Sequence, residues 1–240
     1  MRIAANLAAN AAAQAAADGA VFEAIFNLSS PQPDRHWMAD GQAHELQIGD
    51  SRIVVRVEDE AGRINPNLAA PVLLEGLLRG VGSEPEKAAD LAEAISEWVG
   101  SVQVTRTPEE LLAEYRAAGF DYGPPVSPLE SMDGLGRVRG MTPTLLAAML
   151  PHVSLFSPAQ PDPAHADPIV AAAIAFADGG RVQAGRKRAP NDADGGPVTV
   201  RIKAIARGPH DAEATRMAIA RVGSLNAVGY LLLSWETAIE

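Results

Sequence analysis

The chain has 240 residues, of which 47% are hydrophobic and 21% charged, a balance typical of a globular protein with a sizeable core. Thirty acidic residues outweigh twenty basic ones, and the formal charge of −10 disfavours binding to nucleic-acid phosphates or anionic membrane surfaces. Cysteine is absent, which excludes disulfides, thiolate metal sites and cysteine nucleophiles.

A helix is predicted over residues 2–28, because Ala dominates this segment and its larger apolar residues recur at helical spacing. Those residues are Ile3, Leu7, Phe22, Ile25 and Phe26. The prolines between 29 and 33 end the helix. The segment is neither apolar enough to span a bilayer nor patterned like a signal peptide. Since the sequence opens within a helix and without an N-cap, we expect it to be a portion of a longer protein.

Two strands are predicted next, over residues 43–48 and 51–58, separated by Gly49-Asp50, a pair suited to a tight hairpin turn. In the second strand Ile53, Val55 and Val57 alternate with more polar neighbours. This alternation indicates one strongly buried face.

A helical block is predicted over residues 65–150, with Asn65 as the first N-cap and Pro66 in the first turn. The apolar face of its first helix is assigned to Leu68, Val72, Leu73, Leu77 and Leu78. Further helices are expected to end at Trp98 and to span 108–118 and 142–150. Residues 58–150 carry seven basic and fifteen acidic residues, a net charge of −8.

The last third begins with an extended segment at 152–157 and a short helix at 168–177. Residues 179–197, which include Arg186-Lys187-Arg188, are predicted to form a mobile loop. Strands are predicted at 198–206 and 230–235, whereas residues 212–222 fit either a strand or a short helix. The predicted layout is therefore a helix, strands, a helical block and further strands.

Three strings in this layout resemble a known family. They are VEDEAGRINPN at residues 57–67, LAEAISEW at 91–98 and VRGMTP at 138–143, which follows Pro128-Leu129-Glu130-Ser131. Their order and spacing, together with the closing strands, resemble the K-type minor pseudopilins of the type II secretion system. The resemblance covers most of the chain from residue 45 onward.

The resemblance implies an α+β fold in which a pilin-like N-terminal helix lies on an antiparallel sheet and a large all-helical domain is inserted between strands. The corresponding limits are 1–60 for the first part of the pilin-like domain, 61–180 for the inserted domain and 181–240 for the closing strands. Such proteins are structural and have no enzymatic role. They are periplasmic domains of inner-membrane-anchored proteins in Gram-negative bacteria, and the membrane segment of the family is missing from this sequence.

The resemblance also implies partners. K-type subunits assemble with the minor pseudopilins I and J at the tip of a periplasmic pseudopilus that exports folded proteins across the outer membrane. We expect the N-terminal helix to supply the main contact through Phe22, Ile25 and Phe26, and the sheet edge to supply a secondary one.

Many members of this family bind calcium through carboxylates in the loops after the Asp/Glu-Trp position. Calcium needs six to eight oxygen ligands, and residues 99–104 contain no carboxylate. The candidate ligands in this sequence are Glu97, Glu109, Glu110, Glu114 and Asp121. The sequence leaves calcium binding open.

Parts of the sequence also fit two other functions. Residues 73–95, with the turn Gly80-Val81-Gly82, resemble a helix-hairpin-helix nucleic-acid module, but Glu84 and Glu86 flank the turn that would approach phosphate. A hydrolase would use carboxylates such as Glu58 and Glu60, although a cluster of acidic residues at a strand end is more often a solvated turn.

Overall fold

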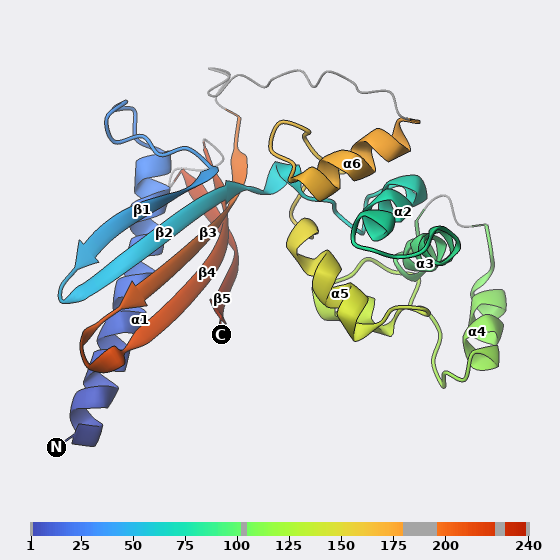
Figure 1. Ribbon diagram of the computed structural model, residues 1–240, viewed down its shortest axis with the longest axis horizontal. Helices are drawn as coiled ribbons and strands as arrows, with labels where there is room; N and C mark the ends of the chain where they lie inside the picture. The colour runs from blue at the N-terminus through green and yellow to red at the C-terminus, as the bar shows by residue number, and fades with distance from the viewer. Residues whose placement is uncertain (1, 102–104, 180–195, 224–228, 239–240) are drawn as a thin grey trace. The chain divides into compact units, whose positions relative to one another are not determined.

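The computed structural model describes residues 2–101, 105–179, 196–223 and 229–238 (Figure 1). The contacts of the chain divide it into two compact units, Met1–Glu60 with Arg188–Glu240 and Ala61–Lys187. We call them the sheet unit and the helical unit. Most of the loop predicted at 179–197 lies outside the described residues.

The sheet unit consists of one long helix on one face of a five-stranded antiparallel sheet with the strand order β1-β2-β3-β4-β5 (Figure 1). Its elements are α1 (Arg2–Leu28), β1 (Asp40–Ile48), β2 (Ser51–Asp59), β3 (Val198–Arg207), β4 (Glu213–Val222) and β5 (Tyr230–Ala238). The predicted strands are confirmed, and the ambiguous segment near residues 212–222 is a strand. The mixed helix and antiparallel-sheet class predicted from the sequence is therefore confirmed.

Small side chains form the interface between α1 and the sheet. The buried face of α1 consists mainly of alanines at helical spacing, namely Ala9, Ala13, Ala16, Ala17, Ala20 and Ala24. They pack on a sheet face that also carries buried alanines, namely Ala204, Ala206, Ala214, Ala218 and Ala220. The predicted helix is confirmed, but most of its larger apolar residues lie outside this interface, since Ile3, Leu7, Phe22 and Phe26 are exposed.

The strands β2 and β3 are neighbours in the sheet although the whole helical unit separates them in sequence. Their register pairs Arg52 with Arg207 at one end and Asp59 with Val200 at the other. The chain leaves the sheet directly after β2 through Glu60, which is fully buried and bonded to Arg201 of β3 at 2.6 Å. This ion pair holds the point of departure against the neighbouring strand.

The helical unit contains α2 (Pro71–Gly80), α3 (Pro85–Trp98), α4 (Pro108–Ala117), α5 (Pro143–Met149) and α6 (Pro168–Ala177). Helix α2 packs against both α3 and α6. The contact with α6 is close, because a Cβ on Gly76 of α2 would lie 2.9 Å from the carbonyl oxygen of Ala173. The core of the unit is built from leucines and from Ile95, Trp98 and Tyr115.

Two local predictions for this unit were wrong. Asn65 does not cap a helix, because α2 starts at Pro71 after Ala70, and Leu68 and Val72 are exposed. The Asn65 side chain instead donates hydrogen bonds to the carbonyls of Leu155 and Ser157, at 3.1 and 2.9 Å. The segment 152–157 is mostly turn, with Val153 in an isolated parallel bridge to Ile64. In both cases hydrogen bonds to a segment far away in the sequence decide the local conformation, and the short-range residue pattern does not.

Enlarging an inward alanine of α1 should destabilise the sheet unit. We expect Ala20→Leu to cost about 1–3 kcal/mol, because the fully buried side chain has no room to grow. This corresponds to a fall in Tm of about 3–10 °C in a thermal melt. The matched control is Ala15→Leu on the exposed side of α1, which should leave Tm nearly unchanged. Equal effects of the two variants would contradict the packing described here.

A second prediction concerns Gly62 in the helical unit. A Cβ at this position would lie 2.1 Å from the carbonyl oxygen of His165, so Gly62→Ala must displace backbone and should cost at least about 2 kcal/mol. Gly136→Ala is the control, since its nearest neighbour, Leu146 Cδ2, lies at 3.5 Å. Chemical denaturation of both variants measures the difference, and a Gly62→Ala variant as stable as the wild type would refute the close approach.

Candidate interaction surfaces

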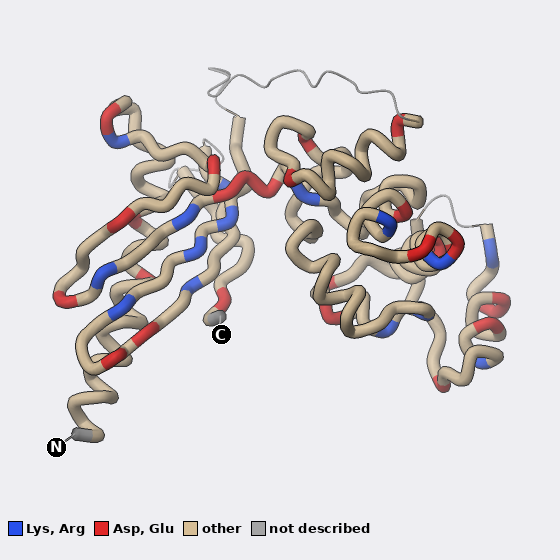
Figure 2. Tube along the Cα trace, viewed as in Figure 1, with Lys and Arg blue, Asp and Glu red and all other residues tan. Residues whose placement is uncertain are grey.

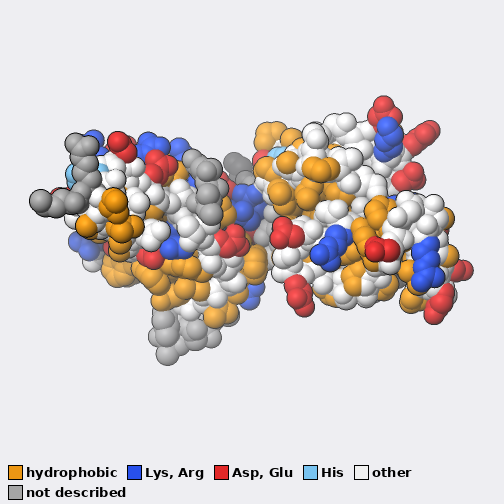
Figure 3. All heavy atoms as spheres, turned by 90° about the horizontal axis from the view of Figure 1, so that it is seen from below, with side chains coloured by type: hydrophobic (Ala, Val, Ile, Leu, Met, Phe, Trp, Pro, Cys, Tyr) orange, Lys and Arg blue, Asp and Glu red, His pale blue; other side chains and the backbone are white. Residues whose placement is uncertain are grey.

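The exposed side of α1 carries large apolar side chains. Because the alanines turn inward, Ile3, Leu7, Phe22 and Phe26 lie outside the buried face of α1, with exposed fractions of 78%, 65%, 44% and 59%. Hydrophobic side chains gather on the sheet unit in the view from below (Figure 3). Of the three predicted contact residues, Phe22 and Phe26 are accessible, whereas Ile25 is 4% exposed and belongs to the core.

Phe22 is positioned by a chain of contacts that links α1 to the last two strands. Its ring lies 5.6 Å from that of Trp235 on β5, with an interplanar angle of 30°. The guanidinium of Arg216 on β4 lies 5.2 Å from the Trp235 ring and bonds Asp18 of α1 at 2.5 Å. Because Trp235 is itself 36% exposed, the two aromatic rings extend the apolar surface from α1 to the edge strand β5.

Phe26 lines an open hollow of about 510 Å³ between α1, the following loop and β1. Trp37 and His44 stack in this hollow with their ring centroids 3.8 Å apart and nearly parallel. Glu23, Asp34 and Glu45 place carboxylates in its wall. Phe26 therefore lies where the apolar side of α1 meets an acidic, aromatic-lined depression.

The five predicted calcium ligands do not converge on one point. Glu97 is 1% exposed, and both it and Glu114 bond the guanidinium of Arg106. Glu110 forms a capping box with Thr107 at the start of α4. Hydrogen bonds from the Thr107 amide and hydroxyl hold the pKa of the Glu110 carboxyl below its ordinary value.

The remaining two candidates, Glu109 and Asp121, are exposed. Within the described residues, no group of three or more His, Asp or Glu side chains is placed to hold a metal ion. The structure thus assigns Glu97 and Glu114 to ion pairing and Glu110 to capping, and the question of calcium binding that the sequence leaves open is not settled by these contacts.

The carboxylates considered for hydrolysis serve the fold. Glu60 is fully buried and its Oε1 accepts a hydrogen bond from Arg201 Nε at 2.6 Å. Glu58 of β2 lies directly opposite Arg201 of β3 in the sheet register. This arrangement satisfies a buried charge at the end of β2.

The hairpin considered for nucleic-acid binding is part of the helical core. Helices α2 and α3 face each other through Leu77, Leu78 and Ile95, all fully buried. A Cβ on Gly80 would lie 2.9 Å from the side chain of Ile169 on α6. The glycine therefore allows α6 to pack closely against the end of α2. Figure 2 shows several acidic residues along α3 and α4, a distribution unsuited to phosphate binding.

The sequence alone did not indicate that Trp235 and Arg106 each connect side chains from several elements. Trp235 was recognised only as the end of an apolar strand, and Arg106 was not singled out. Arg106 contacts residues up to thirteen positions away on two different helices, and no local periodicity marks such a residue.

Comparison with known proteins agrees with this geometry. The family model "Type II secretion system (T2SS), protein K" matches residues 51–158. The fold is similar to a chain of the crystal structure of the GspK-GspI-GspJ complex from the enterotoxigenic Escherichia coli type 2 secretion system, with a TM-score of 0.62 and 16% sequence identity over 94% of each chain. No curated protein sequence matches the chain.

The matched segment and the fold point in the same direction, and the helix-hairpin-helix alternative finds no support. By this match and this fold, the chain is similar to the protein K family of the type II secretion system. Among the described residues, no helix is both long and apolar enough to cross a membrane.

Proposed function

We propose that this protein is a subunit of the pseudopilus tip that assembles with the minor pseudopilins I and J and takes part in the export of folded proteins across the outer membrane. The observation that carries this proposal is the shared fold over 94% of the chain with a member of the GspK-GspI-GspJ complex. The exposed apolar side of α1 is the surface best suited to such an assembly, because burying Phe22 and Phe26 in a partner removes apolar area from water.

The two compact units have different roles in this proposal. The sheet unit, residues 1–60 and 188–240, is the pilin-like domain, and the helical unit, residues 61–187, is inserted between β2 and β3. A filament subunit of pilin type needs only the helix and the sheet to stack with its neighbours. The inserted domain adds bulk that obstructs the addition of a further subunit, which is the property a cap requires.

The proposal includes an inner-membrane anchor, as the family resemblance implies, and no catalytic role. The support for the second point is that Glu60, the best-placed carboxylate of the acidic cluster, is occupied by its ion pair with Arg201. The protein acts through docking and steric occupancy.

Mixing the purified protein with the soluble domains of its I and J counterparts tests the assembly. We expect the three to co-elute in size-exclusion chromatography at micromolar concentration. Replacing both aromatic residues by Phe22→Ser and Phe26→Ser should weaken the complex by roughly 30-fold or more, the effect of losing about 2 kcal/mol at an aromatic anchor.

The matched control is the double variant Leu68→Ser and Val72→Ser, which removes apolar side chains of comparable exposure, 56% and 41%, from the helical unit. This control should bind like the wild type. A wild-type protein that elutes alone would refute the assembly, whereas equal binding by both double variants would remove α1 as the contact surface. Thermal melts of all variants establish that folding is intact.

A further inference from the structure

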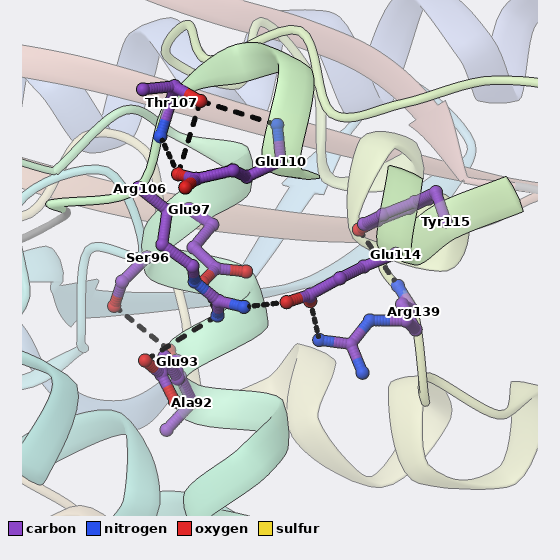
Figure 4. A network of polar contacts seen from close by, with 10 residues as sticks. All are labelled: Ala92, Glu93, Ser96, Glu97, Arg106, Thr107, Glu110, Glu114, Tyr115 and Arg139. Atoms are coloured by element: carbon purple, nitrogen blue, oxygen red, sulfur yellow. Dashed lines mark hydrogen bonds and ion pairs between the residues drawn. The ribbon is translucent and has the colours of Figure 1, made fainter. Parts of the chain in front are cut away.

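One guanidinium in the helical unit gathers carboxylates from two helices. Arg106 lies in the loop before α4 and bonds Glu97 of α3 and Glu114 of α4, while Glu93 Oε1 lies 3.5 Å away (Figure 4). Arg139 approaches the other oxygen of Glu114 at 3.2 Å. The arrangement is a positive centre surrounded by oxygen atoms, with ligands from α3 on one side and α4 on the other.

Burial makes this centre necessary. Glu97 is 1% exposed, and a carboxylate removed from water requires a compensating positive charge. Arg106 is itself largely covered, with 28% of its side chain exposed. The ion pair therefore differs from a surface salt bridge, which contributes little to stability because solvent screens it.

Neighbouring contacts fix the positions of the ion-paired groups. The capping box between Thr107 and Glu110 starts α4 directly after Arg106. At the far side of α4, the backbone amide of Arg139 donates a hydrogen bond to the hydroxyl of Tyr115 at 3.1 Å. The loop before α4, α4 itself and the segment at Arg139 are thus tied to α3 through one charged centre.

A calcium ion does not fit among these groups as they stand. It needs at least about six oxygen ligands at roughly 2.3–2.6 Å. Here Oε1 of Glu97 and Oε1 of Glu114 bond the Arg106 guanidinium, Oε2 of Glu114 lies 3.2 Å from Arg139, and Oε2 of Glu97 is buried without a hydrogen-bond partner among the described residues. A divalent cation close to these oxygens would also lie within a few ångströms of Arg106 and be repelled by it. Arg106 occupies the position from which a metal ion would neutralise the same carboxylates.

We propose that Arg106 replaces a metal ion in this protein, supplying the positive charge that holds α3, the loop before α4 and α4 together. A guanidinium is covalently attached and always protonated, so chelators cannot remove it. The stability of the helical unit is then independent of calcium.

Thermal melts of the whole chain in the presence of a chelator and in the presence of added calcium test the inference, with magnesium as the control for ionic strength. We expect the Tm of the wild type to agree within about 1 °C across these conditions, since a ligand that binds only the folded state would raise it. A wild-type Tm that rises by several degrees with calcium and not with magnesium would overturn the proposal.

Variants test the role of the residue itself. Arg106→Gln should lower the Tm by about 5 °C or more in chelator, because it leaves Glu97 buried without its cation. Arg106→Lys retains the charge but not the planar fork, so we expect an intermediate value. Arg116→Gln, in the exposed last turn of α4, is the matched control and should melt like the wild type. An Arg106→Gln variant as stable as this control would also overturn the proposal.

Discussion

Close approach between α1 and the sheet is the constraint on which the sheet unit depends. Alanine on both sides, such as Ala20 on α1 and Ala218 on β4, lets the helix lie near the strands with little side-chain volume between them. Little apolar area is buried per residue in such an interface, so its stability depends on tight fit along the whole helix. The same choice of residues leaves Phe22 and Phe26 outside this interface and exposed.

The second constraint is a fixed point at the end of β2, where the chain passes from the sheet into the helical unit. The buried Glu60–Arg201 pair fixes the end of β2 beside β3, so that the two strands stay in register despite the helical unit between them. Within the helical unit, Arg106 performs a comparable task by neutralising the buried Glu97. Glu60 and Glu97 are thus each paired with an arginine from another segment of the chain. These ion pairs hold neighbouring elements in place.

Local patterns predicted the elements well because helices and strands are periodic over short spans. The strand alternation at Ile53, Val55 and Val57 gave the buried face correctly, since each of these side chains is at most 1% exposed. The inward face of α1 was missed because alanine is only weakly apolar, and the larger residues drew attention to the opposite side. Asn65 failed as a cap because its partners, the carbonyls near Leu155, lie about ninety positions away. Contacts of that range, like those of Arg106, depend on the tertiary fold.

The adjacency of β2 and β3 has a consequence for how the protein reaches its native state. During synthesis α1, β1 and β2 emerge first, yet the strands that complete their core, β3 and β4, begin only at Val198. The helical unit between them contains its own core and can form from contacts that are closer in sequence. The apolar faces of α1 and of the β1–β2 hairpin therefore stay open to solvent and to chaperones until the ribosome reaches about the last fifth of this sequence.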